Sequence, residues 1–210
     1  MAEDRAALFV FAHQDDEMAA AFHIGREVKH GRAVHCVFLT DGRTARASAD
    51  VRNRESLDVL TRLGVAPDHV HFPGTEIPIA DGTLVEHLDA ALEALDRSVS
   101  DVGTVYCLAW EGGHQDHDAS HLVAAALAAR RGISDRCFEI PLYRRLIGPF
   151  FRVFSPLGEG WEWSGAGFGE GFALSLLPWR FRSQRRSWLG LRAGGAGLRR
   201  TWIPPELAGL

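Results

Sequence analysis

Residues 8 to 17 read Leu-Phe-Val-Phe-Ala-His-Gln-Asp-Asp-Glu, an apolar run that ends abruptly in polar and ionisable side chains. The apolar part, residues 8 to 12, is too short and too aromatic for a helix and is typical of a buried strand in a parallel sheet. The polar part then lies at the carboxyl end of that strand, where open α/β folds bind their ligands. The sequence therefore predicts a functional site directly after its first strand.

Three residues of this stretch, His13, Asp15 and Asp16, combine an imidazole nitrogen with carboxylate oxygens. Zinc takes such ligands, and a turn could point His13 and Asp16 at one ion while Asp15 faces a bound water. An alternative is that the two aspartates only cap the following helix, because aspartate stabilises helix starts. A second cluster favours the metal.

The second cluster follows another apolar run, residues 104 to 110, and reads Glu-Gly-Gly-His-Gln-Asp-His-Asp-Ala-Ser-His over residues 111 to 121. If a helix starts inside it, His114 and His117 can have different tasks, one as a metal ligand and one facing the substrate. A carboxylate such as Asp116 raises the basicity of a histidine that it hydrogen-bonds. Two clusters of this kind at two strand ends of one predicted sheet indicate a metal site.

His121 raises a rival assignment, because it follows His117 by four residues and the two could form a helical zinc pair of the peptidase type. That pair needs a glutamate directly after its first histidine as general base. Here the position holds Asp118, which has a shorter side chain. The peptidase interpretation is therefore disfavoured.

The spacing of apolar residues along the chain predicts alternating strands and helices. Further strands are predicted at residues 33–40, 69–72 and 136–143, and helices at residues 18–30, 50–63 and 84–99. This alternation favours a Rossmann-like three-layer α/β sandwich with a mainly parallel sheet of about five strands. The first turn lacks Gly-x-Gly-x-x-Gly, which disfavours a dinucleotide cofactor.

Beyond Arg144 the periodic pattern breaks. Glycines crowd between residues 158 and 171, together with Trp161, Trp163 and Phe168. The composition predicts an irregular loop whose aromatic side chains either wall the site or pack in the core.

The charge is unevenly distributed, because residues 171 to 205 contain seven arginines and no acidic residue in a chain of net charge −4. Tryptophans interleave with these arginines, a mixture that can bind a membrane surface or an anionic ligand, or pair with the acidic remainder of the chain. We expect the segment to border the site, with Arg185 and Arg186 favouring a large or anionic substrate.

The length of 210 residues, 46% of them hydrophobic, suits a single domain. No apolar stretch reaches the roughly 18 residues of a membrane span, and the N-terminus does not read as an export signal, so a cytoplasmic protein is expected. We expect no nucleic-acid partner. The cysteines, Cys36, Cys107 and Cys137, lie in apolar segments and are expected to be reduced core residues.

The two clusters resemble the motifs of the PIG-L/LmbE-like zinc-dependent de-N-acetylases, which remove acetyl groups from N-acetylglucosamine-bearing substrates. The family motifs Ala-His-Pro-Asp-Asp-Glu and His-Pro-Asp-His correspond to residues 12–17 and 114–117, with Gln14 and Gln115 in place of the prolines. Softer matches extend the resemblance over about residues 7 to 145. Because proline fixes φ and lacks an N–H, the two glutamines are expected to alter loop stiffness or nearby hydrogen bonds and to spare the ligands.

The resemblance implies that His13, Asp16 and His117 bind zinc or another divalent transition metal, and that Asp15 is the general base. It implies that His114, oriented by Asp116, stabilises the oxyanion or donates a proton. It also implies substrate contacts from Arg52 and Asp81. We expect one domain over residues 1–210, with a core at about 7–145 that the resemblance covers and an excursion over the active-site edge at about 146–210. The expected substrate is a small molecule or glycoconjugate with an N-acetyl or related N-acyl amino sugar. A catalytically silent metal- or sugar-binding protein and a zinc amidase for a non-sugar acyl amine are the alternatives.

Overall fold

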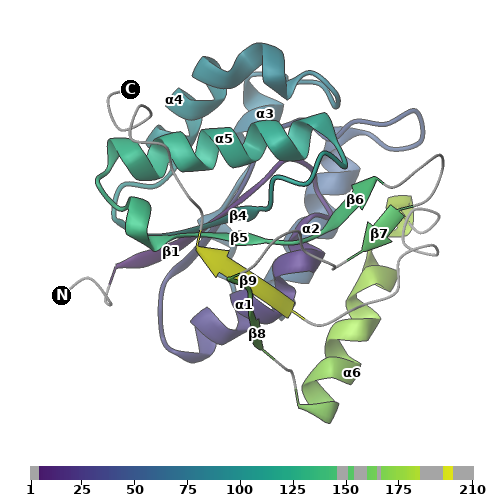
Figure 1. The fold of residues 1–210 in the computed structure, drawn as a ribbon. Coiled ribbons are helices and arrows are strands. Elements are labelled where there is room, and N and C mark those ends of the chain that lie inside the picture. Colours follow the sequence, from purple (N-terminus) through teal and green to yellow (C-terminus); the bar gives the residue numbers. More distant parts are fainter. Residues whose placement is uncertain (1–4, 146–150, 154–159, 165–166, 185–195, 201–210) are drawn as a thin grey trace.

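The computed structural model describes residues 5–145, 151–153, 160–164, 167–184 and 196–200. Its main sheet has the strand order β3-β2-β1-β4-β5-β9-β8 (Figure 1). The strands of this sheet are β1 (Ala6–Phe11), β2 (Val34–Phe38), β3 (Val70–His71), β4 (Val102–Leu108), β5 (Cys137–Ile140), β8 (Glu162–Ser164) and β9 (Ala196–Arg200). The first five run parallel, and β9 pairs antiparallel with both β5 and β8.

Helices connect the parallel strands, and a short hairpin follows β5. The α-helices are α1 (Glu17–Lys29), α2 (Ala49–Arg62), α3 (Pro73–Glu76), α4 (Leu88–Ser98), α5 (Gln115–Arg130) and α6 (Phe168–Leu176). Single 3₁₀ turns are η2 (Pro67–His69), η3 (Leu84–His87), η4 (Ser134–Arg136), η5 (Leu177–Arg180) and η6 (Arg182–Gln184). The hairpin consists of β6 (Tyr143–Arg145) and β7 (Phe151–Val153).

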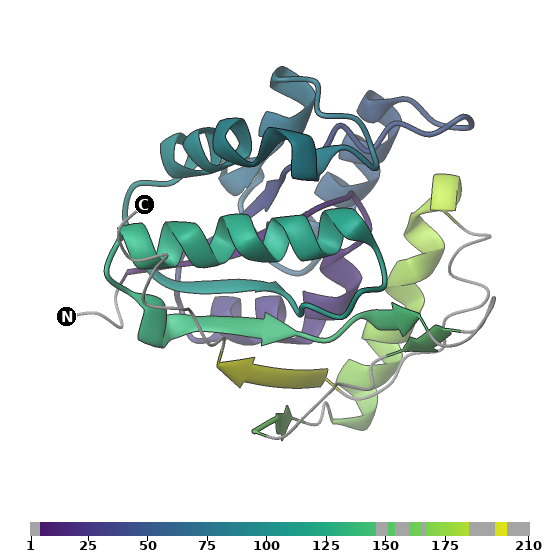
Figure 2. The same ribbon diagram turned by 45° about the horizontal axis from the view of Figure 1, so that its top comes forward.

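Alternate residues of the central strand β1 point into two separate hydrophobic cores. Leu8 and Val10 belong to the core beneath α4 and α5, whereas Phe9 and Phe11 belong to the core beneath α1 and α2. Figure 2 shows α4 and α5 on one side of the sheet and α1 on the other. Every residue of β1 is buried, as expected for a strand covered on both faces. The Rossmann-like three-layer sandwich with a mainly parallel sheet is confirmed.

Two expectations about the later chain need correction. The strand predicted at residues 136–143 is shorter, because β5 ends at Ile140 and Tyr143 already belongs to β6. The irregular loop predicted at residues 158–171 contains the strand β8 and the start of α6 among its described residues. Pairing with β9, which lies more than thirty residues later in sequence, forms β8. Such a long-range partner cannot be recognised from local composition.

The predicted core location of the cysteines is confirmed: Cys36, Cys107 and Cys137 lie buried in β2, β4 and β5. Within the part of the chain that the structure describes, no helix has the length and apolarity needed to cross a bilayer.

Two glycines allow a matched test of the fold. A Cβ added to Gly74 would lie 2.3 Å from the carbonyl carbon of Leu39 and 2.4 Å from the nitrogen of Thr40, both backbone atoms. Backbone cannot move aside without distorting the loop after β2. We therefore expect Gly74→Ala to lower the free energy of unfolding by about 2 to 3 kcal/mol in urea denaturation.

Gly25 is the control, because it lies inside α1 and a Cβ there would meet nothing within 4 Å. Gly25→Ala is expected to raise the free energy of unfolding by about 0.5 to 1 kcal/mol, since alanine loses less backbone entropy on folding. Equal stability of the two variants would contradict the close approach of Gly74 to the loop.

Candidate metal centre and active site

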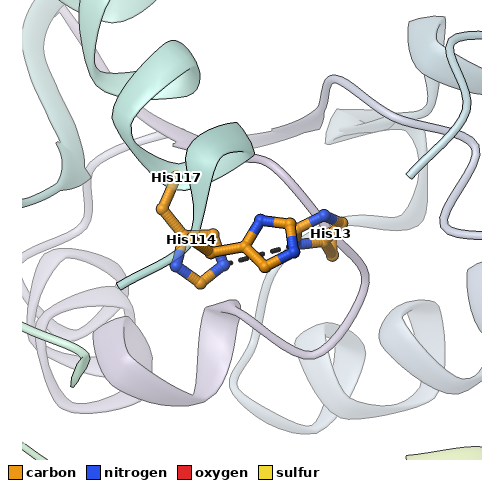
Figure 3. A group of neighbouring side chains, drawn as sticks. All are labelled: His13, His114 and His117. Carbon is orange, nitrogen blue, oxygen red and sulfur yellow. Dashed lines mark hydrogen bonds between the residues drawn. The ribbon is translucent and has the colours of Figure 1, made fainter. Parts of the chain in front are cut away.

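The two motif clusters meet because their strands are neighbours. The first cluster leaves β1 and the second leaves β4, and these strands pair in parallel at the centre of the sheet. Their carboxyl ends therefore open at the same edge, where the first polypeptide turn leads into α1 and the second into α5. Figure 3 shows His13, from the first turn, beside His114 and His117 at the start of α5.

Three side chains converge at distances that suit one tetrahedral metal ion. His13 Nδ1 lies 3.3 Å from His117 Nε2 (dashed in Figure 3). The two oxygens of Asp16 lie 3.1 Å from His117 Nε2 and 3.5 Å from His13 Nδ1, respectively. Ligands about 2.0 to 2.1 Å from zinc at tetrahedral angles lie roughly 3.3 Å apart. The donor types, two imidazoles and one carboxylate, therefore suit zinc, with a different oxygen of Asp16 facing each imidazole.

All three side chains are nearly inaccessible to solvent. Burial alone would raise the pKa of the Asp16 carboxyl, but the imidazoles of His117 and His13 hold that pKa well below its usual range. Asp16 is also the residue that caps α1, yet its side chain makes no capping hydrogen bond. Instead its carboxylate accepts from the backbone N–H of His13 at 2.7 Å. The interpretation of Asp16 as a simple helix cap is therefore not supported by its contacts.

Asp116 has a different partner from the expected one. Its carboxylate lies 3.0 Å from Nε2 of His13, and it accepts the backbone N–H groups of Gly82 at 2.6 Å and Leu84 at 3.1 Å. Only the backbone N–H of Asp116 contacts His114, at Nδ1. The expectation that the Asp116 carboxylate orients His114 is thus replaced by contact with His13, the kind of carboxylate–histidine pair that fixes a metal ligand's orientation.

His114 caps α5, since its Nδ1 accepts the N–H of Asp116 at 3.2 Å. A neutral imidazole whose Nδ1 is an acceptor carries its proton on Nε2. That nitrogen lies 3.7 Å from the carboxylate of Asp81, and about a third of the His114 side chain is exposed. Burial, with the nearby His13 and His117, lowers the pKa of His114. His114 therefore presents a neutral N–H donor at the open side of the site.

Asp15 has an unusual backbone conformation beside the metal donors. Among the described residues it is the one non-glycine residue with a positive φ, 124°. Its N–H donates to Oε2 of Glu17 at 2.8 Å, and its Oδ1 accepts from Arg52 at 2.7 Å. Burial raises the pKa of the Asp15 carboxyl to about 6, although Arg52 opposes the shift. Backbone strain of this kind clusters at functional sites.

Arg52 is buried, and its guanidinium is engaged by the turns around it. Besides Asp15, it donates to the carbonyl oxygens of Gly42, at 2.6 Å, and of Gln14. This arrangement ties the first turn to α2 and fixes the carboxylate of Asp15. These contacts already occupy much of the hydrogen-bond donor capacity of Arg52. The predicted contact of Arg52 with a sugar stays a prediction.

Both glutamines that replace the motif prolines make side-chain hydrogen bonds to neighbouring segments. Gln14 donates to Asn53 Oδ1 at 2.7 Å and to the carbonyl of Thr40 at 3.3 Å. Gln115 donates to the carbonyl of Gly82, in the loop that carries Asp81. The two glutamines therefore add side-chain hydrogen bonds that proline could not make.

Gln115 is the first residue of α5, a position where proline is readily accepted. We expect Gln115→Pro to fold and to bind metal like the parent, but to raise KM about three- to tenfold, because one hydrogen bond that holds the Asp81 loop is lost. Measurement of KM, kcat and bound metal on the best substrate would check this. An unchanged KM would show that Gln115 does not position the loop.

Two residues near the site were not predicted from the sequence. The ring of Tyr143 packs edge-on against His117, with centroids 5.2 Å apart, and Glu111 accepts the N–H of Leu142 at 2.8 Å. Burial raises the pKa of Glu111 to about 7. Glu111 opens the second cluster and could have been found there, whereas no local signal marks Tyr143, which approaches from β6.

His121 does not join the metal donors. Its Nδ1 lies 2.9 Å from the carbonyl oxygen of Leu108 and 3.8 Å from Glu139, on the inner side of α5. The structure therefore gives no support to the rival pair of His117 and His121. Instead, two groups of possible ligands occur among the described residues, and both contain His13 and His114: one adds His117, and the other adds Asp81 and Asp116.

Comparison with protein families gives one match, over residues 8–128, to the family described as PIG-L, GlcNAc-PI de-N-acetylase. The matched region begins in β1 and ends inside α5, so it contains both clusters. No curated protein matched the chain.

Solved structures with the same fold include two deacetylases. The A40926 pseudoaglycone deacetylase Dbv21 is 14% identical, with a TM-score of 0.66, and the match covers 95% of this chain and 99% of that one. The zinc-inhibited form of teicoplanin deacetylase is 14% identical, with a TM-score of 0.63 and coverage of 93% and 98%. The 4-carboxy-2-hydroxymuconate hydratase GalB from Pseudomonas putida KT2440 is 16% identical, with a TM-score of 0.51 and coverage of 95% and 97%. At sequence identities this low, the structural similarity shows a shared fold and does not assign a reaction.

Proposed function

The chain belongs to the family of PIG-L, GlcNAc-PI de-N-acetylases, and from this premise we propose that it is a metal-dependent deacetylase acting on an N-acetyl or related N-acyl amino sugar. The proposal rests on the side-chain nitrogen and oxygen atoms of His13, Asp16 and His117, which lie 3.1 to 3.5 Å apart. The neighbouring Asp15 carboxylate pairs with Arg52. Zinc is the first choice for two imidazoles and one carboxylate, and another divalent transition metal would suit the same donors.

When bound, the metal would polarise the amide carbonyl and make a water molecule more acidic. Asp15 would accept a proton from the water as its oxygen adds to the carbonyl carbon, a role that suits a carboxyl with a pKa of about 6. The Nε2–H of His114 would donate a hydrogen bond to the developing oxyanion, and the proton taken up by Asp15 would pass to the departing nitrogen. Cleavage of the C–N bond then leaves a carboxylic acid and a free amine.

The loop around Asp81 would form part of the substrate-binding wall. Asp81 is exposed and faces both His13 and His114, at 3.2 and 3.7 Å. A carboxylate at the open side of the site can accept hydrogen bonds from sugar hydroxyl groups. The alternatives are a silent binder and an amidase for non-sugar amines, and the hydratase among the similar structures illustrates that the fold alone does not decide the reaction.

The proposal is tested by metal analysis of the purified protein, followed by a screen for free amine. The substrates would be N-acetylglucosamine, its glycosides and lipid conjugates, and N-acetylated amines without a sugar. We expect about one bound metal per chain and amine release from a sugar substrate, abolished by chelation and restored by zinc. Release only from the sugar-free amines would favour the amidase, and binding of the sugars without release would favour the silent binder.

A further inference from the structure

Helix α6 and the turn η5 expose a row of large apolar side chains. The row consists of Phe168, Phe172, Leu176 and Trp179, which are 95, 62, 50 and 56% exposed. Their spacing of four, four and three residues places them along one helical face. No residue of α6 is buried, although the helix is mostly apolar. A row of this kind on a folded protein indicates an interaction surface.

The row lies beside a cluster of arginines. An open cavity of about 650 Å³ between α2 and η5 is lined by Arg54, Arg180 and Arg182, together with Leu176 and Trp179 from the row. Figures 1 and 2 both show α6 outside the layers of the sandwich. The apolar row and the cationic cavity therefore form one continuous surface, which we name the α6 surface.

Among the described residues, no carboxylate forms an ion pair with an arginine of the α6 surface. Two acidic residues, Glu55 and Asp58, also line the cavity. Glu55 accepts from the backbone N–H and the hydroxyl of Ser183, and Asp58 accepts from Arg62. Within the described part of the chain, no ion pair involves Arg54, Arg180 or Arg182. The cavity thus presents three guanidinium groups to an anion from outside.

We propose that the α6 surface docks onto an anionic lipid bilayer. Guanidinium groups bind phosphate through paired hydrogen bonds, while phenylalanine and leucine enter the acyl region and tryptophan prefers the interface. The charge agrees, because the described residues from 171 to 184 include Arg180 and Arg182 and no acidic residue. A two-fold symmetric dimer through this surface is a poorer solution for an arginine cluster, since the second copy would bring the same positive surface.

The orientation that results would bring the active site to the lipid surface. Arg54 lines the cavity, and Arg52, two residues earlier on the same helix, contacts Asp15 at 2.7 Å. The first turn of α2 therefore lies between the docking surface and the site. Lipid docking needs no catalysis, so this inference stands or falls separately from the proposed deacetylase activity.

Vesicle sedimentation tests the docking. The full-length protein is incubated with vesicles of equal parts phosphatidylglycerol and phosphatidylcholine, or of phosphatidylcholine alone. We expect sedimentation with the anionic vesicles that weakens as salt is added, and little with the neutral ones. Phe168→Ser with Phe172→Ser should lower the partition coefficient at least about tenfold, and Arg180→Gln with Arg182→Gln roughly fivefold per charge removed.

Matched controls lie away from the α6 surface. Val85→Ser removes an apolar side chain that is 51% exposed, in η3, and Arg97→Gln removes an exposed charge from α4. Both should sediment like the parent. No sedimentation with anionic vesicles, equal sedimentation with neutral ones, or an effect of the controls equal to that of the surface variants would overturn the proposal. So would a dimer in light scattering that Phe168→Ser with Phe172→Ser dissociates while lipid binding persists.

Discussion

Replacing Asp15 by asparagine is expected to slow amine release by about 10² to 10⁴ while the bound metal stays in place. Asparagine keeps the size of the side chain and can still accept a hydrogen bond from Arg52, which lies 2.7 Å from Asp15 Oδ1. It removes only the basic oxygen. Because Asp15 is not among the three closely spaced donors, the metal content should not change.

Asp16→Asn is the matched control, because it makes the same chemical change one residue later. Asp16 lies 3.1 Å from His117 Nε2, so a neutral amide there should weaken metal binding first and activity as a consequence. Metal content by atomic emission and amine release with an acetylated amino sugar separate the two cases. If Asp15→Asn released amine as fast as the parent, the proposed mechanism would be wrong even with the metal site intact.

The sheet was predictable from local pattern because each parallel strand is buried on both faces. The apolar run at residues 8–12 corresponds to β1, and the run at residues 104–110 corresponds to β4. The boundaries shift by about two residues, because an apolar side chain can continue past the last ladder hydrogen bond. The polar residues that end each run then mark the carboxyl edge of the sheet.

The candidate donors could be named from residue type and position, but the partner of Asp116 could not. Its carboxylate is held by the backbone of Gly82 and Leu84, which lie more than thirty residues earlier. The resemblance pairs Asp116 with His114, two residues earlier, whereas the loop of Gly82 and Leu84 holds the carboxylate beside His13. The direction of a side chain in a turn depends on contacts with residues that are distant in sequence, so local sequence does not predict it.

The C-terminal part shows where local pattern carries least information. The helix α6 contains Gly169 and Gly171, which weaken helix signals, so the segment read as a loop. The arginines expected to select the substrate, Arg185 and Arg186, lie outside the described residues, as do Trp188 and Trp202. Their roles, the single-domain organisation and the cytoplasmic location stay predictions.

The position of the metal depends on which nitrogen of His13 binds it. Nδ1 faces His117 and Asp16, whereas Nε2 faces Asp116 at 3.0 Å and Asp81 at 3.2 Å. Asp116 already accepts two backbone N–H groups and is fully buried, so it is suited to hold the proton on Nε2. The Nδ1 side therefore offers the better metal site.

His117→Ala is accordingly expected to weaken zinc binding at least about 100-fold, since even changing a partner of a ligand costs about 10- to 100-fold. Asp81→Asn should bind zinc nearly as well as the parent and should mainly raise KM. Competition with a chromophoric chelator measures both affinities. Absence of tight zinc binding in the parent would show that hydrogen bonds alone set the spacing of His13, Asp16 and His117. Loss of zinc in Asp81→Asn but not in His117→Ala would place the ion on the Nε2 side of His13. Asp116 would then be a metal ligand, not a hydrogen-bond partner of His13.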